Sequence, residues 1–262
     1  MAFLSIVVLN YNRFKYTKQT IENLMEKTKL KHEFIFVDNG SKDGTRKYLT
    51  SLKGRTTAVR EIYVFNKWNF GVAGGKSSGM IHARGDYVFV CDDDILVPDN
   101  YDKLLVDVLN VEGMGMSGVN VEGKSYPIVE IDGVTMQRKK ENLNGGFMAW
   151  KREIIQKVGY FSPDTVYGGD DTGMHLRIKA LGLMNAYIVP NGIHLDEKLD
   201  KKYEEFKKKE HMYNSRSMRY IGYNTIKHKK YHNQFVPYRV PNRFRGESGK
   251  IMPKINMLKN DK

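Results

Sequence analysis

Strand-like and helix-like segments alternate through the first 110 or so residues, and this alternation restricts the chain to a small set of folds. Apolar runs rich in β-branched and aromatic residues predict strands at Phe3–Asn10, Glu33–Asp38, Glu61–Asn66 and Asp86–Cys91. Helices are expected between them at Tyr16–Lys27, from Asp43 to Leu52, and at Gly71–Ala83. Repeated βα units place strands in parallel and helices on both faces of the sheet. The pattern therefore predicts an α/β fold with a mostly parallel central sheet.

The pattern changes after about residue 110. Short strands are expected at Gly115–Val121, Pro127–Val134 and Ala186–Val189, helices at Arg152–Val158 and Thr172–Leu181, and a Gly/Asp loop at Tyr167–Asp171. Farther along, a Lys/Glu-rich helix is expected at Leu199–Arg219. We therefore expect one domain over residues 1–196, with halves at 1–110 and 111–196, followed by a basic, largely helical C-terminal extension over 197–262.

Composition narrows the class of protein. Of the 262 residues, 40% are apolar and 28% are charged, which is ordinary for a soluble globular protein. The single cysteine, Cys91, rules out an internal disulfide and predicts a reducing, cytoplasmic setting. The apolar start of the chain lacks a basic region before it, and no apolar run reaches transmembrane length. We therefore expect the start to be a buried strand.

The positive charge is concentrated near the end of the chain. The formal net charge is +13, and residues 211–262 hold 12 Lys and Arg against two acids. Aromatic residues are interleaved with these cations, and such mixtures can neutralise phosphates and stack on bases. The tail thus predicts an anionic partner: nucleic acid, an acidic membrane surface or an anionic glycan. A solvated basic surface explains the same composition.

Three consecutive aspartates, Asp92, Asp93 and Asp94, follow the apolar run that ends at Cys91. Three carboxylates at the end of a buried strand repel one another and lose hydration, and a divalent cation relieves both costs. Ligands of open α/β sheets bind beyond the carboxyl ends of the strands, where this cluster would lie. Capping of a helix that begins near Pro98 would explain one acid but not three. The cluster therefore predicts a site for Mg²⁺ or Mn²⁺.

A second acidic pair, Asp170 and Asp171, follows two glycines and precedes a helix. Adjacent carboxylates raise each other's pKa, so one of them can act as a general base. Capping of the helix by one Asp is the alternative. His194 stands alone in its segment, and a metal role for it is open on the residues alone.

Two further segments suggest nucleotide binding. Asp38 ends a strand beside a Gly/Ser turn, where it can accept hydrogen bonds from a ribose or a base, although plain turn chemistry gives the same pattern. The stretch Gly71–Ser77 fails the P-loop spacing by one residue. Its small residues predict close approach of a helix to the sheet, and Lys76 can meet phosphate oxygens.

Taken in order, these segments resemble a known family. The segments are Ser5–Arg13, Val37–Ser41, Asn69–Gly71, Gly85–Asp94, Asn144–Phe147, Arg152–Glu153, Val158–Phe161 and Gly169–Asp171. The ordered set, over about residues 3–196, closely resembles family 2 glycosyltransferases of the Rossmann-like GT-A fold. The resemblance implies a nucleotide-diphosphate sugar donor, a divalent metal and inversion at the anomeric carbon.

The resemblance also implies a role for each matched residue on the donor side. Asn10 and Tyr11 would line the base pocket, and Asp38 would bond the base, usually uracil. Lys76 stands where the family often has an Arg near the nucleotide. Asp92 would face the ribose, Asp92 and Asp94 would be the two ends of the metal-binding DxD motif, and Asp93 is counted with the donor-binding residues. His194 would be a further metal or diphosphate ligand.

On the acceptor side, Asp171 matches the catalytic base, which deprotonates the acceptor hydroxyl. Asp170 replaces a more usual Glu beside it, and Gly145, Gly146 and Trp150 would belong to the acceptor wall. The expected protein is thus a metal-dependent glycosyltransferase, with a UDP-sugar as donor and a polyanionic acceptor, either a glycan or a hydroxylated base in DNA as in phage DNA modification. The alternatives are a catalytically silent sugar-nucleotide or glycan-binding module and a nucleotidyltransferase.

Overall fold

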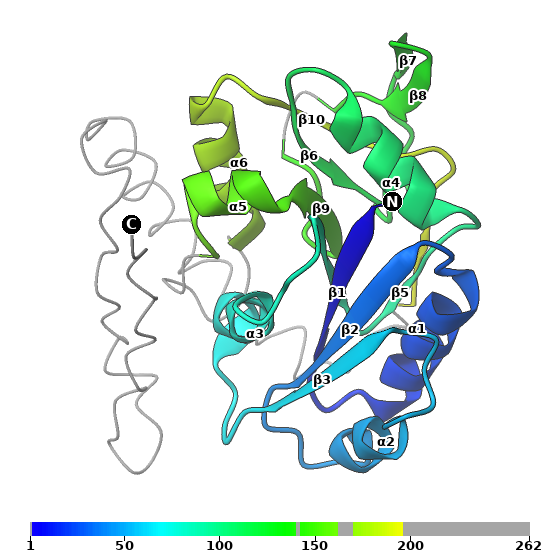
Figure 1. Cartoon of the computed structure of the whole chain (residues 1–262), viewed down its shortest axis with the longest axis vertical. Coiled ribbons are helices and arrows are strands. Elements are labelled where there is room, and N and C mark those ends of the chain that lie inside the picture. Colours follow the sequence, from blue (N-terminus) through cyan, green and yellow to red (C-terminus); the bar gives the residue numbers. More distant parts are fainter. Residues whose placement is uncertain (1, 140–141, 162–169, 196–262) are drawn as a thin grey trace.

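The computed structural model describes residues 2–139, 142–161 and 170–195 (Figure 1). The strands are β1 (Phe3–Asn10), β2 (Lys31–Asp38), β3 (Arg60–Phe65), β4 (Tyr87–Asp92), β5 (Ile95–Leu96), β6 (Met114–Gly118), β7 (Ile128–Ile131), β8 (Val134–Gln137), β9 (Phe147–Lys151), β10 (Met184–Tyr187) and β11 (Ile193–His194). The helices are α1 (Phe14–Lys27), α2 (Thr45–Ser51), α3 (Gly71–Met80), α4 (Tyr101–Asn110), α5 (Arg152–Val158) and α6 (Asp170–Ala180). The basic extension expected at 197–262, with its helix, lies outside the described residues.

Nine strands form one sheet in the order β3-β2-β1-β4-β9-β6-β10-β8-β7. The pairs β1–β2, β2–β3, β1–β4 and β6–β10 are parallel, whereas β9 is antiparallel to both β4 and β6. The hairpin β7–β8 closes one edge. The expectation of a mostly parallel sheet in an α/β fold is therefore confirmed, and the sheet continues without a break from the first half of the domain into the second.

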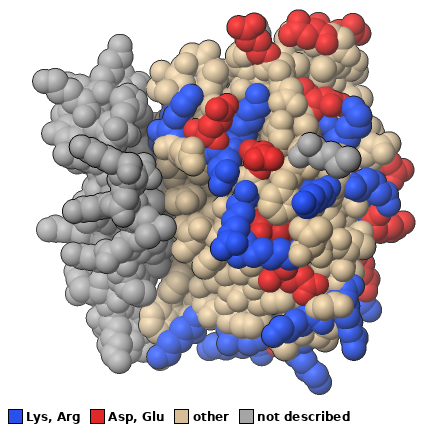
Figure 2. All heavy atoms as spheres, in the orientation of Figure 1, with Lys and Arg blue, Asp and Glu red and all other residues tan. Residues whose placement is uncertain are grey.

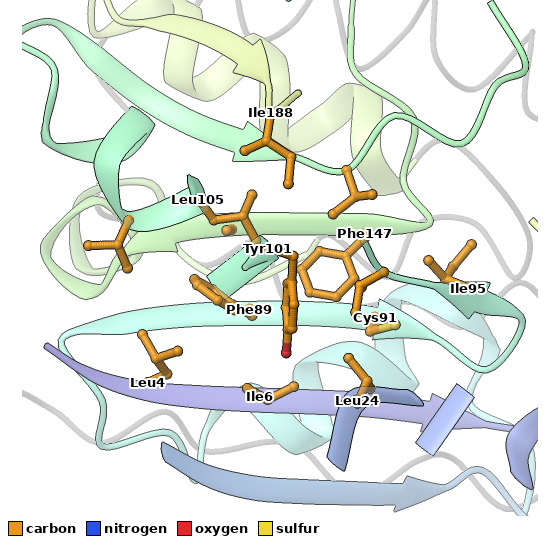
Figure 3. Packing of buried hydrophobic residues seen from close by; sticks show 14 of the residues in the cluster. Leu4, Ile6, Leu24, Phe89, Cys91, Ile95, Tyr101, Leu105, Phe147 and Ile188 are labelled. Carbon is orange, nitrogen blue, oxygen red and sulfur yellow. The ribbon is translucent and has the colours of Figure 1, made fainter. Parts of the chain in front are cut away.

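Alternate residues of the central strands face two separate cores. Leu4, Ile6 and Val8 of β1 pack with residues of α1, α2 and α4, while Val7 and Leu9 pack with residues of α3, α5 and α6. Since strand side chains alternate between faces, helices cover both sides of this sheet, as predicted. Figure 3 shows the first of these cores, where the ring of Tyr101 is tilted against that of Phe89 from β4 and stands edge-on to that of Phe147 from β9.

Helix α3 lies very close to the sheet because it presents glycines to it. A Cβ atom at Gly79 would be 2.5 Å from a methyl carbon of Val7, and one at Gly75 would be 2.5 Å from a methyl carbon of Leu9. Side chains at these two positions would push the helix outward. The close approach of helix to sheet that the small residues predict is confirmed, and it brings Lys76 near the carboxyl end of the sheet.

Several elements differ from the sequence prediction. Strand β9 was not predicted, since its residues were read only as part of a motif, yet it is the link between β4 and β6. The expected strand at 127–134 is instead a hairpin of β7 and β8, which turns at Asp132 and Gly133, both with positive φ. Helix α6 begins at Asp170, so the two acids expected in a loop lie in its first turn.

The surface of the described part has mixed charge. On the face that Figure 2 shows, Lys and Arg side chains lie among Asp and Glu side chains. This agrees with the sequence, which puts most of the net charge after residue 210. Within the described residues, no helix combines the length and the hydropathy that a membrane span needs.

Candidate active site

The candidate site lies where β1, β2 and β4 end. Parallel strands bring their carboxyl ends to the same edge of the sheet, and here Asn10 pairs with Asp38 while Asp92 pairs with Leu9, one residue earlier in β1. The chain continues from β4 through Asp93 and Asp94 into the short strand β5. The acidic cluster is thus at the edge of the sheet where ligands of α/β folds bind.

Asp94 and His194 come together from positions 100 residues apart. Strands β5 and β11 pair in a small second sheet, with His194 opposite Ile95, and the backbone N–H of Leu195 donates to the carbonyl of Asp94. The imidazole Nε2 of His194 lies 3.1 Å from Asp94 Oδ2. His194 therefore lies beside the last aspartate of the DxD motif, and its role as a ligand stays a prediction.

Arg13 is the second partner of Asp94. Its Nη1 lies 2.5 Å from Asp94 Oδ2 and 3.8 Å from Asp93 Oδ1. Burial alone would raise the pKa of Asp94, but the hydrogen bond from His194 and the charge of Arg13 outweigh it, so the pKa is lowered and the carboxylate is ionised at neutral pH. The sequence motif contained Arg13 without a role for it. Its place just past the end of β1 was the available signal.

Few side chains of the candidate site could coordinate a divalent metal. Among the described residues there is no group of three His, Cys, Asp or Glu arranged to hold a metal. Asp94 and His194 offer one carboxylate oxygen and one imidazole nitrogen, which suit Mn²⁺. Asp92, expected as a further ligand, instead has Oδ1 3.1 Å from Lys76 Nζ. The residues present therefore fit a metal held by two side chains, with its other positions filled by ligands that are not protein side chains.

Asp93 has a different environment from its two neighbours. It is buried, and its Oδ2 accepts hydrogen bonds from the backbone N–H of Tyr11 and the hydroxyl of Thr17, both at 3.2 Å. These contacts tie the end of β4 to the turn between β1 and α1. The donor-binding role expected for Asp93 therefore has no support in its contacts.

The expected base pocket contains one open residue and two buried ones. Tyr11 is 39% exposed. Asn10 is fully buried, and its amide donates to the carbonyls of Val8 and Val37, so it holds the ends of β1 and β2 together. Asp38 is also fully buried, with Oδ2 2.5 Å from Arg46 Nε. Only Tyr11 is therefore placed to line a pocket in the way expected for all three.

Lys76 joins the two acidic clusters. Its Nζ lies 3.1 Å from Asp92 Oδ1, 3.1 Å from Asp170 Oδ2 and 3.0 Å from the carbonyl oxygen of Gly145. The side chain is 1% exposed. Burial alone would lower the pKa of Lys76, but the carboxylates of Asp170 and Asp92 outweigh it and raise the pKa. Lys76 was expected beside the nucleotide, and its ammonium is found between two carboxylates.

Asp171 lies next to the glycine segment before β9. A Cβ atom on Gly145 would be 3.2 Å from Asp171 Cβ and 3.4 Å from Asp171 Oδ2, so the glycine lets this carboxylate lie close to the backbone. Burial and the neighbouring charge of Asp170 raise the pKa of Asp171, while hydrogen bonds from Thr172 oppose this rise. A raised pKa makes a carboxylate a better proton acceptor, which agrees with the role of general base.

The segment that carries Gly145 is held by residues that sequence reasoning did not find. The backbone N–H of Leu143 donates to His175 Nε2 at 2.7 Å, and His175 Nδ1 lies 2.8 Å from the carbonyl of Asp171. The backbone N–H of Asn144 donates to the hydroxyl of Tyr187. His175 follows Asp171 by four residues, so the two share one face of α6, and this spacing was the available signal.

Trp150 does not belong to an open wall. Its side chain is fully buried, and its ring packs edge-on against Phe161 at a centroid distance of 5.8 Å. Strand β9 turns this residue toward the core that contains α3, α5 and α6. The acceptor-wall role expected for Trp150 is therefore not carried further, whereas Gly145 and Gly146 do lie beside Asp171 and the end of β4.

Comparison with known sequences identifies the family. The family model described as "Glycosyl transferase family 2" matches residues 5–176, more than half of the chain. Glycosyltransferase GlyG of Streptococcus pneumoniae serotype 4 is 29% identical over 130 residues, which are 50% of this chain and 41% of GlyG. The chain thus spans well under two thirds of the length of this relative.

Comparison with solved structures identifies the same fold. Mannosyltransferase PcManGT of Pyrobaculum calidifontis, solved with GDP-Man and Mn²⁺, has a TM-score of 0.61 at 21% identity, over 78% of this chain and 60% of its own. GalNAc-T7, solved with UDP, GalNAc and Mn²⁺, has a TM-score of 0.61 at 14% identity, over 75% of this chain and 44% of its own. Sheet and family match lead to one conclusion: this chain belongs to glycosyltransferase family 2, and its domain has the GT-A fold.

Proposed function

We propose that this protein is an inverting, metal-dependent enzyme that transfers a sugar from a nucleoside diphosphate, UDP in the first place, to an acceptor hydroxyl. The observation that carries the proposal is the arrangement of two acidic groups around one site. Asp94 with His194 follows β4, and Asp171 begins α6 beside Gly145. A displacement at the anomeric carbon needs a charged site for the leaving group and a separate base for the attacking hydroxyl.

On the acceptor side, Asp171 is the base. Its raised pKa and its close approach to the backbone at Gly145, a segment of the candidate acceptor wall, suit a carboxylate that takes the proton of an acceptor hydroxyl. The oxygen of that hydroxyl forms a bond to the anomeric carbon while the bond from this carbon to the diphosphate oxygen breaks. Attack and departure on opposite faces invert the configuration of the sugar.

On the donor side, Asp94 and His194 would hold the metal. A bound Mn²⁺ or Mg²⁺ neutralises charge on the departing diphosphate. Arg13 lies against the same carboxylate and adds a permanent positive charge to this side of the site. Tyr11, partly exposed at the end of β1, is the residue best placed to contact the nucleobase.

The acceptor is proposed from the sequence of the tail. The 12 Lys and Arg residues after position 210 favour a polyanionic acceptor, and the interleaved rings favour nucleic acid over a glycan. Binding to duplex DNA and to an anionic glycan across a salt series separates the two. Contacts to DNA phosphates predict that log affinity falls by about 0.9 per neutralised phosphate for each decade of salt.

The single, buried Cys91 is consistent with a reducing cytoplasm as the site of action.

A donor panel tests the function directly. The protein is incubated with UDP-, GDP- and CDP-sugars, with Mn²⁺ or with EDTA, and release of the nucleoside diphosphate is measured. We expect release from one class of donor, dependent on the metal and lost in Asp171→Asn. Donor binding without any release would indicate a silent binding module. Release of pyrophosphate from a nucleoside triphosphate would indicate a nucleotidyltransferase.

A further inference from the structure

Lys76 is the most completely enclosed cation near the site. Three oxygens lie within 3.1 Å of its ammonium: Asp170 Oδ2 and the carbonyl of Gly145 accept hydrogen bonds from it, and Asp92 Oδ1 forms an ion pair with it. With a side chain that is 1% exposed, no donor of this ammonium is directed to solvent. A phosphate oxygen would have to displace one of these three partners, so the contacts argue against a phosphate-binding role.

The three partners of Lys76 come from three different elements. Asp92 ends β4, Gly145 precedes β9, and Asp170 begins α6, while Lys76 itself belongs to α3. A second contact joins the glycine segment to the end of β4, because the carbonyl of Gly146 accepts the backbone N–H of Asp92 at 2.8 Å. One ammonium therefore fixes the end of the donor-side strand, the glycine segment and the start of the helix that carries the base.

We propose that Lys76 is a positioning residue that holds Asp171 in register with the donor side of the site. Asp170 and Asp171 are neighbours in the first turn of α6, so an anchor on Asp170 restricts the position of Asp171 as well. The effect on turnover rests on the proposed function. The anchoring of α6 by Lys76 does not depend on that function. Misplacement of a catalytic group by about 1 Å can lower a rate by about 10²-fold.

The first test separates positioning from phosphate binding. In Lys76→Met, we expect turnover to fall by about 10²-fold while affinity for UDP, measured by calorimetry, stays within about threefold of wild type. If Lys76 contacted the diphosphate, affinity for UDP would fall more than tenfold while affinity for uridine would not change, and that result would overturn the proposal. Lys103→Met is the matched control, since it removes an exposed ion pair with Asp107, and it should leave turnover and affinity unchanged.

The second test needs no substrate. Hydrogen exchange of backbone amides in Lys76→Met should be faster than in wild type at residues 143–147 and 170–175, and unchanged in β1 and β2. Unchanged exchange in both segments of the folded variant would refute the anchor, whatever the enzyme's donor proves to be. A protein that keeps the exchange result but transfers no sugar would instead refute the proposed function alone.

A second variant covers the case in which Lys76→Met does not fold. Asp170 is 6% exposed and Asp92 is about one third exposed, so Asp170 is the carboxylate that most needs a counter-charge. In Lys76→Met/Asp170→Asn, the buried charge is gone, and we expect the thermal stability lost in Lys76→Met to return while turnover stays about 10²-fold low. Return of turnover to the wild-type value would show that Lys76 only compensates charge, which would contradict the proposal.

Discussion

At the scale of single residues, three adjacent aspartates have three different sets of partners. Asp92 contacts Lys76, Asp93 accepts from the turn after β1, and Asp94 lies between Arg13 and His194. The three aspartates share one sequence motif but differ in their contacts. The first aspartate is linked through Lys76 to Asp170, the second is tied to the start of α1, and the third is the one we propose as a metal ligand.

Asp94→Ala tests the metal side. The variant loses one of two proposed ligands and should lose Mn²⁺-dependent turnover, while its affinity for Mn²⁺ in the presence of UDP, measured by calorimetry, should fall at least tenfold. The fold should persist, because the change also removes one charge from the acidic cluster. Asp99→Ala, at a side chain that is 85% exposed, is the control. Full activity of Asp94→Ala, or of wild type in excess EDTA, would disprove the metal assignment.

Asp171→Asn tests the base. Asparagine keeps the volume of the side chain but cannot accept the acceptor's proton, so turnover should fall by about 10²–10⁴-fold. Affinity for the nucleotide should change little, because Asp171 lies on the acceptor side beside Gly145. Kinetics with saturating donor, together with calorimetry, measure the two quantities. Normal turnover with weakened nucleotide binding would move Asp171 to the donor side.

At the scale of elements, α6 and the segment before β9 are held together by His175. Burial lowers the pKa of His175 to about 4, and its Nε2 accepts the backbone N–H of Leu143, which only a neutral imidazole can do. The carbonyl of Asp171 on the other ring nitrogen fixes the tautomer. This clamp lies one helical turn from the proposed base, so it adds a second link between α6 and the segment before β9, besides that through Lys76.

The clamp predicts a specific loss of stability in acid. Because the unfolded chain takes up a proton on this histidine near its ordinary pKa of about 6.5 and the folded chain only near 4, folding is progressively disfavoured as pH falls from about 6.5 to about 4. Over this pH range, protonation of the histidine in the unfolded chain lowers the free energy of unfolding by about 3 kcal/mol. Urea unfolding of wild type and His175→Phe across this range should show their difference in unfolding free energy shrinking as pH falls. His82→Phe, at an exposed position, controls for loss of a histidine. A difference that does not depend on pH would contradict the prediction.

Helix α3 gives a second prediction at this scale. In Gly79→Ala, the new methyl group would lie 2.5 Å from Val7 and 2.7 Å from Val37, so the variant should lose about 1–3 kcal/mol of unfolding free energy. In α6, a Cβ atom at Gly173 would meet nothing within 4 Å, so Gly173→Ala should instead gain about 0.5–1 kcal/mol. Denaturant unfolding compares the two. Equal effects of the two substitutions would show that α3 does not depend on close approach.

At the scale of the whole molecule, the sequence predicted the alternating strands and helices of the first half. It missed elements whose position depends on residues far away in the chain. The βα units of the first half were predictable because the strands are rich in β-branched and aromatic residues and α1 has one apolar face. Strand β9 was not, because its pairing with β4 and β6 is set by residues far away in the chain. The contact between Asp170 and Lys76 is also one that no local pattern shows, because the two residues are 94 positions apart.

The candidate site divides in the same way. The sequence predicted that Asp94, His194, Asp171 and Gly145 belong to one site, since motif order specifies them. It did not show the burial of Lys76, Asn10, Asp38 and Trp150 or their protein partners, since these depend on segments that meet only in the folded chain. Tertiary contacts, which residue type alone does not reveal, distinguish a binding residue from a supporting one.

The most direct test of the account is the configuration of the sugar that the enzyme releases. With the α-configured donor found in the panel and with water as acceptor, proton NMR at early times reads the anomer before it equilibrates. The account predicts that Mn²⁺-dependent hydrolysis gives the β anomer together with the nucleoside diphosphate, and that Asp171→Asn abolishes both. Initial release of the α anomer, or undiminished hydrolysis by Asp171→Asn, would contradict the assignment of Asp171 as the base of an inverting transfer.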